Sequence, residues 1–178
     1  MNLEDWSKLI GIIAALLGGL KFLVEYSRSN RQKEDEFRWK KAELARKILD
    51  EMFGDPLSRS ALRMLDWWER TYTAPDNRQF RVTTAIVLAG LRVKNMTFTH
   101  EEQFVRDCFE RFYDMTDSIE HFMRAGLLSP EDVLPPLRYY SDCISKHRDV
   151  HSAFWKTYGY EFTEAFFSRF GAKPGDTA

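Results

Sequence analysis

Three side chains that could bind a metal or carry a proton recur every fourth residue near the end of the chain. They are Cys143, His147 and His151, and on one continuous helix this spacing places them on a common face. A thiolate and imidazoles are ligands that zinc prefers, and two of them one turn apart can begin a metal site. No further ligand is evident and apolar residues share the face, so we expect packing in a core and predict no cofactor.

The two histidines are also the candidates for acid–base catalysis. Helical ribonucleases of the HEPN type use an arginine that binds phosphate, a spacer of about four to six residues, and a histidine that titrates near neutral pH. Here Arg138 precedes His147 with eight residues between them, and Arg148 precedes His151 with two. The motif is therefore absent as written. His147 and His151 stay as catalytic candidates, but we favour a protein without catalysis.

Composition excludes several larger classes of protein. The chain has 178 residues, 44% of them hydrophobic, and a net charge of −1 from 26 basic and 27 acidic side chains. This is enough apolar material for a core, and so balanced a charge argues against electrostatic capture of nucleic acid. Two cysteines rule out a disulfide-rich scaffold. The sequence has no glycine-rich phosphate loop, CxxC pair, HExxH or GxSxG motif, which removes the commonest motif-bearing enzymes.

The N-terminal part of the sequence predicts a membrane anchor over residues 1–26. Residues 9–20 carry no charge, and apolar residues continue after Lys21. Aromatic residues at both ends of such a run are typical of the two membrane interfaces, and a lysine near the end of a span can reach the headgroups. The residues that we expect at the interfaces are Trp6, Lys21, Tyr26, Arg28 and Arg31.

The distribution of basic residues predicts the orientation of this span. Residues 1–8 contain one basic side chain, whereas residues 25–41 contain six. Because basic residues stay on the cytoplasmic side, we expect a single-pass protein of the inner membrane, with its N-terminus outside and its C-terminal domain in the cytoplasm. Two alternatives compete with this prediction. A cleaved signal peptide would need a basic start that is missing here, and a buried helix of a soluble domain would explain the short run and Lys21.

Two features of the sequence predict protein partners. Gly11, Ala15 and Gly19 recur every four residues, so they share one face on which helices can approach closely in lipid, and we expect self-association there. Trp67 and Trp68 point about 100° apart on a helix, so one of them would be exposed or covered by a partner. The predicted partners are therefore membrane lipid, further copies of this chain and an unknown cytoplasmic protein.

The remainder of the sequence predicts helices only. A charged juxtamembrane helix over 27–54 precedes a cytoplasmic helical domain over 55–171 and a disordered tail over 172–178. Asp55-Pro56 and the capping box Thr99–Glu102 mark helix starts. Residues 79–94 alternate like a strand at first but also fit a helix, which we choose because no partner strand is evident. The expected fold is all-α: a transmembrane helix, a charged helix and a compact bundle.

The stretches 104–140 (FVRDCFERFYDMTDSIEHFMRAGLLSPEDVLPPLRYY), 61–72 (ALRMLDWWERTY) and 85–93 (AIVLAGLRV) carry a family resemblance. They resemble an uncharacterised bacterial family with one N-terminal span, a charged juxtamembrane helix and a small cytoplasmic helical domain. The shared motifs are structural, an acidic-aromatic helix and a Gly-Leu-Leu-Ser-Pro-Glu-Asp helix start. The layout is also similar to the membrane-anchored, HEPN-like accessory proteins of type VI-B CRISPR systems, which implies assembly through the spans in phage defence.

These observations lead to one expected function and two alternatives. We expect a membrane-anchored, non-enzymatic protein-binding module that can self-assemble through its span. The first alternative is an oligomeric effector that perturbs membranes in stress or phage defence. The second is an HEPN-like domain that binds or cleaves RNA, although the spacing of its motif is missing.

Overall fold

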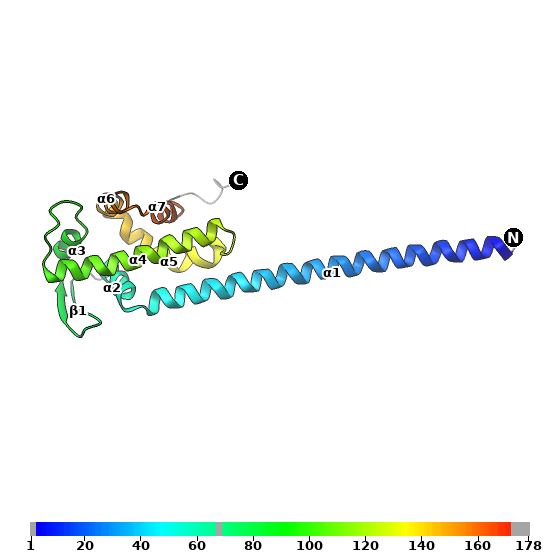
Figure 1. Ribbon diagram of the computed structural model, residues 1–178, viewed down its shortest axis with the longest axis horizontal. Coiled ribbons are helices and arrows are strands. Elements are labelled where there is room, and N and C mark those ends of the chain that lie inside the picture. Colours follow the sequence, from blue (N-terminus) through cyan, green and yellow to red (C-terminus); the bar gives the residue numbers. More distant parts are fainter. Residues whose placement is uncertain (1–2, 67–68, 172–178) are drawn as a thin grey trace. The chain divides into compact units, whose positions relative to one another are not determined.

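The computed structural model describes residues 3–66 and 69–171, with side chains from residue 19 onward (Figure 1). The chain divides into two compact units between residues 41 and 42. The predicted tail, 172–178, lies outside the described residues. Helix α1 (Leu3–Gly54) is continuous, so the 27–54 segment is not a separate helix.

In the first unit, α1 is exposed at every described residue from 19 to 40. Pairs one turn apart support it, including Glu36 and Lys40, whose carboxylate oxygen and ammonium nitrogen are 2.6 Å apart. Lys41 lies over the ring of Phe37, with its nitrogen 4.8 Å from the ring centre. The helix is thus held by local side-chain contacts.

The predicted membrane span is wrong. Over the part of the chain that the structure describes, no helix is long and apolar enough to cross a membrane. Lys21 and Glu25 interrupt the described apolar residues within two turns, and α1 then continues as a charged helix. The predicted single-pass fold, the location in the inner membrane and the orientation with the N-terminus outside all depended on this span, so they are wrong as well.

The second unit contains residues 42–171 and surrounds one long helix. This central helix, α4, packs against α2, α3 and α7 (Figure 1). Its capping box is confirmed: Thr99 Oγ1 accepts from the Glu102 N–H, and Glu102 accepts from the Thr99 N–H. The elements of the unit after α1 are α2 (Pro56–Asp66), β1 (Arg70–Thr73), β2 (Gln79–Val82), α3 (Thr84–Gly90), α4 (His100–Arg124), α5 (Pro130–Ser145), α6 (Arg148–Tyr158) and α7 (Glu161–Ser168).

Aromatic side chains fill the core between α4, α6 and α7. Phe112, Tyr113 and Trp155 are buried, and the Trp155 ring stacks on Phe167 with 5.3 Å between ring centres. Each buried ring of this size removes a large apolar area from water, worth about 2 kcal/mol or more. The core therefore ties the C-terminal helices to the central helix.

The all-α prediction is also wrong, because a two-stranded antiparallel hairpin is present. Strand β1 pairs with β2, with Tyr72 opposite Phe80. Both side chains are buried and both face Phe104 of α4. The first part of the segment predicted as helix over 79–94 is thus a strand, and α3 begins only after Thr83, whose side chain caps it.

The break between α5 and α6 also differs from expectation. The prolines Pro135 and Pro136 lie within α5, which continues to Ser145. The chain leaves helical geometry at His147, where φ is −130° and ψ is 39°. Residues 143–151 therefore do not form one continuous helix, and this interruption changes where the candidate metal ligands lie.

Candidate functional site

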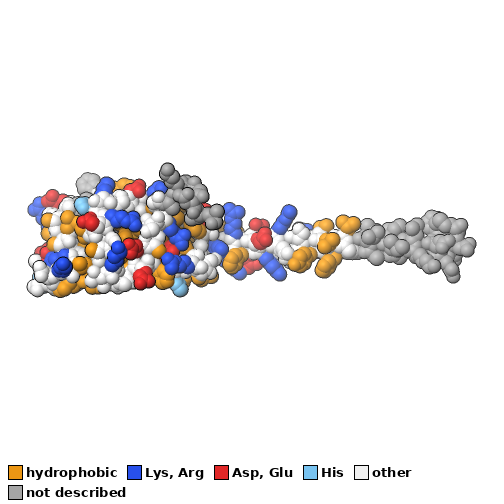
Figure 2. Space-filling view, turned by 90° about the horizontal axis from the view of Figure 1, so that it is seen from above, with side chains coloured by type: hydrophobic (Ala, Val, Ile, Leu, Met, Phe, Trp, Pro, Cys, Tyr) orange, Lys and Arg blue, Asp and Glu red, His pale blue; other side chains and the backbone are white. Residues whose placement is uncertain are grey.

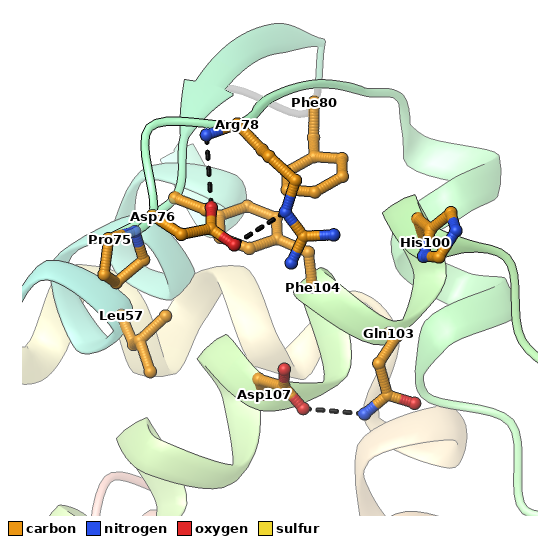
Figure 3. Close-up of a pocket in the computed structure, with 10 residues that line it drawn as sticks. Leu57, Pro75, Asp76, Arg78, Phe80, His100, Gln103, Phe104 and Asp107 are labelled. Carbon is orange, nitrogen blue, oxygen red and sulfur yellow. Dashed lines mark hydrogen bonds and ion pairs between the residues drawn. The ribbon is translucent and has the colours of Figure 1, made fainter.

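A pocket opens between the hairpin, the start of α2 and the first two turns of α4 (Figure 3). Its volume is about 300 Å³, which is the lower end of the range for small ligand sites. Apolar groups and charged side chains both line it. The lining residues are Leu57, Ala74, Pro75, Asp76, Arg78, Phe80, His100, Gln103, Phe104 and Asp107.

The hairpin turn fixes one side of the pocket. The Asn77 N–H donates to the Ala74 carbonyl at 2.9 Å, and Asn77 has a φ of 67°, which asparagine tolerates better than most residues. Asp76 then accepts twice from Arg78, from its backbone N–H at 3.1 Å and from Nε at 2.6 Å. These bonds hold the Arg78 guanidinium over the pocket, where its centre lies 5.4 Å from the centre of the Phe80 ring.

The opposite side of the pocket is one face of α4. His100, Gln103, Phe104 and Asp107 follow the i, i+3, i+4, i+7 spacing, so successive turns of the helix present them together. Gln103 Nε2 donates to Asp107 Oδ1 at 2.7 Å. The helix thus places a carboxylate and an amide at the rim and an aromatic ring between the hairpin and the helix.

Two stacked rings form the floor. Phe80 and Phe104 have ring centres 4.9 Å apart and planes inclined by 20°. Each of the two residues is 6% exposed, so the pair belongs to the core and only a small part of it borders the pocket. Stacked aromatic rings give such a site a rigid apolar surface.

The rim carries two groups with unused bonding capacity. Hydrogen bonds from the backbone and side chain of Arg78 lower the pKa of Asp76, so this pair is ionised and neutral overall. Within the described residues, no acceptor is bonded to the outer nitrogens of Arg78, and no cation is paired with Asp107. In Figure 3 the Arg78 guanidinium and the Asp107 carboxylate lie on opposite sides of the open space.

The three candidate metal ligands do not lie together. Cys143 lies on α5, His147 lies in the break and His151 lies on α6, so they do not share one helix face. Among the described residues, no group of three potential metal ligands gathers anywhere. The 143–147–151 spacing predicts a common face only if the helix is continuous.

His151 instead belongs to the core. Its side chain is fully buried, and its Nδ1 lies 2.6 Å from the Tyr113 hydroxyl. Burial lowers the pKa of His151 to about 3, and His147 contributes in the same direction. A histidine with these properties stays neutral at physiological pH, which does not suit it to the role of a catalytic acid.

Half of the other predicted site residues lie outside the part of the chain whose side chains the structure describes. The side chains of Trp6, Gly11 and Ala15, and the pair Trp67 and Trp68, lie outside the described residues. The described members of the predicted membrane-facing sets are all exposed: Gly19, Lys21, Tyr26, Arg28 and Arg31. Among the described side chains, none lies within 4 Å of the place that a Cβ would take at Gly19.

No protein-family model, curated protein or solved structure significantly matches the chain. The family resemblance therefore stays a prediction, and the function must be argued from the geometry of the pocket.

Sequence reasoning missed this pocket although its signals are present. Pro75-Asp76-Asn77 has the composition of a turn, and the capping box correctly placed His100 in the first turn of α4. The interpretation of residues 79–94 as a helix concealed the site, because it removed Phe80 from the hairpin and from Phe104. The signal in the sequence was the alternation of polar and apolar residues over 79–82, which matches the alternating burial of strand β2.

Proposed function

We propose that this chain is a non-enzymatic protein-binding module whose pocket at the start of α4 takes a short segment of a partner. The observation that carries the proposal is the lining of the pocket: two stacked aromatic rings, the Arg78–Asp76 ion pair, and the Asp107 carboxylate, which has no cationic partner among the described residues. A mostly apolar concavity with a few placed polar groups is the usual form of a recognition site.

The lining favours recognition over covalent catalysis. Of the described residues that border the pocket, none supplies a hydroxyl, a thiol or an amine that could act as a nucleophile beside a base. The buried thiol of Cys108 follows Asp107 in sequence, and burial raises its pKa well above the ordinary value, with a smaller contribution from Asp107. That cysteine is therefore kept as an unreactive thiol.

Helix α1 offers a second surface for protein contacts. Between residues 20 and 39 its large apolar side chains are 54–74% exposed (Figure 2), which is the usual sign of a surface that a partner covers. They are Leu20, Phe22, Leu23, Val24, Tyr26, Phe37 and Trp39. Self-association through this helix stays a prediction, which the mass of the full chain in solution would test.

The proposal is tested by binding the full chain to an array of synthetic peptides of random sequence, each present once with a free and once with an amidated C-terminus. Arg78→Gln and Asp107→Asn change the pocket, while Arg59→Gln and Asp142→Asn are matched changes at exposed positions away from it. We expect selected peptides to lose at least about fivefold in affinity with the pocket variants and to keep it with the controls. Peptides that bind all four variants equally, or no selective binding, would contradict the proposal.

A further inference from the structure

The guanidinium of Arg78 is prepared to receive an anion. Its Nε is bonded to Asp76 Oδ2, which orients the planar group, and its outer nitrogens face the open space of the pocket (Figure 3). Two parallel N–H groups of arginine match the two oxygens of a carboxylate, which makes this pairing both strong and directional. The two outer nitrogens of Arg78, which Asp76 leaves unbonded, therefore suit a carboxylate better than they suit a neutral acceptor.

The opposite rim is prepared to receive an N–H donor. Gln103 uses its amide nitrogen to hold Asp107 Oδ1, which leaves Asp107 Oδ2 and Gln103 Oε1 as acceptors. In the described structure neither of these two oxygens has a donor. A ligand that carries both an N–H group and a carboxylate has the groups that complement the two sides.

The floor between the two sides is apolar. Phe80 and Phe104 stack there, and Leu57 and Pro75 border the same space. The pocket volume of about 300 Å³ accommodates one amino-acid residue with its side chain, but not a folded segment. The side chain that this floor accepts is aliphatic or aromatic, because burial against the rings removes apolar area from water.

We propose that the pocket binds the carboxyl-terminal residue of a partner chain, an inference that rests on the function proposed above. The terminal carboxylate pairs with the outer nitrogens of Arg78, the backbone N–H of the same residue donates to Asp107, and an apolar terminal side chain covers Phe80 and Phe104. These three features occur together only at a free chain end or in a free amino acid, so they define the chemistry of the ligand.

The test measures fluorescence anisotropy of the full chain with hexapeptides labelled at the N-terminus and ending in Leu, Phe, Val or Trp. Each peptide is compared with its C-terminally amidated form, and free leucine and N-acetyl-leucine serve as competitors. We expect binding in the micromolar to submillimolar range and at least about a tenfold loss on amidation. Arg78→Gln is expected to abolish the difference between acid and amide, and Arg78→Lys to restore part of it.

The controls distinguish this inference about chain ends from the broader proposal that the pocket binds peptides. Arg59→Gln is expected to leave the preference for the free acid unchanged, and N-acetyl-leucine is expected to compete. If acid and amide bind equally and both depend on Arg78, the pocket binds peptides but the inference about chain ends is wrong. If free leucine competes and N-acetyl-leucine does not, the ligand is an amino acid and the inference is again wrong. If no peptide distinguishes Arg78→Gln from Arg59→Gln, both proposals fail.

Discussion

The hydroxyl of Tyr113 lies 2.6 Å from Nδ1 of His151, and both side chains are fully buried between α4 and α6. This hydrogen bond joins two polar groups in a core of aromatic rings. Because a buried polar group without a partner destabilises the folded state, the pair contributes to the stability of the second unit.

The variant Tyr113→Phe tests the importance of this bond. It keeps the ring and removes the hydroxyl, so His151 Nδ1 loses its partner while the packing stays nearly the same. We expect the free energy of unfolding to fall by about 1–3 kcal/mol in urea titrations. Tyr139→Phe is the control, because the exposed Tyr139 hydroxyl donates to Asp66 at 2.6 Å and its loss should cost less than about 1 kcal/mol. Equal costs for the two variants would show that burial of the bond is unimportant.

The stability of the protein should depend on pH through His151. Burial lowers its pKa to about 3 in the folded state, whereas an unfolded histidine titrates near 6.5. Between these values the unfolded chain binds the proton, so stability is fully present above about pH 6.5 and falls as the pH falls toward 3. The expected slope is about 1.4 kcal/mol per pH unit, measured by unfolding at pH 7, 6 and 5. A flat profile over this range in the wild type would contradict the buried, neutral histidine.

A buried carboxylate joins α4 to the end of α7. Glu120 is fully buried and accepts from Arg169 at 2.7 and 2.8 Å and from Arg124 at 2.9 Å. Burial raises the pKa of Glu120, but the hydrogen bonds from the two arginines outweigh burial and lower the pKa below its usual value. The stability that this pair contributes is present above about pH 4.5 and lost as the pH falls further.

The variant Arg169→Gln removes the bidentate partner and leaves Glu120 with Arg124 alone. We expect a loss of about 3 kcal/mol in the free energy of unfolding at pH 7, because a buried charge loses most of its compensation. Arg148→Gln removes a more exposed arginine, bonded to Ser168 at 3.2 Å, and should cost about 0–1 kcal/mol. The difference between the two variants in the free energy of unfolding should be smaller at pH 3.5 than at pH 7. An equal difference at both pH values would argue against an ionised Glu120.

Close packing of α3 on α4 depends on Gly90. A Cβ at this position would lie 2.9 Å from the Glu102 carbonyl oxygen and 2.9 Å from Val105 Cγ1. We expect Gly90→Ala to lower the midpoint of thermal unfolding through a loss of about 1–3 kcal/mol, because backbone must shift. At Gly54 no atom lies within 4 Å of a Cβ, so Gly54→Ala should be neutral or slightly stabilising. A stable Gly90→Ala protein would mean that the helices separate easily.

Local signals in the sequence predicted where helices start more accurately than they predicted how the elements pack together. Asp55 caps α2 by accepting from the backbone N–H of Leu57 and Ser58, and Gly159 ends α6 with a left-handed φ of 79°. Such caps and turns depend on the types and order of a few adjacent residues, so the local sequence is enough to predict them.

Features that depend on distant contacts were not predictable in the same way. The hairpin forms because Tyr72 and Phe80 pack on Phe104, which is far along the chain. The break at His147 follows no proline or glycine, whereas Pro135 and Pro136 are accommodated within α5. The pocket requires both the hairpin and α4, so the interpretation of residues 79–94 as a helix concealed it. One continuous helix would have placed the candidate metal ligands on a common face, which the break at His147 prevents.

The most direct test of the central claim is an NMR titration. A peptide selected from the binding array is added to the isotope-labelled full chain, and the changes in the backbone amide signals are recorded. The claim that the pocket holds the partner predicts the largest shifts at Arg78, Phe104 and Asp107, and smaller shifts at the same peptide concentrations in Arg78→Gln. Shifts confined to α1 or to α5 and α6, or equal shifts in the variant, would show that partners bind elsewhere.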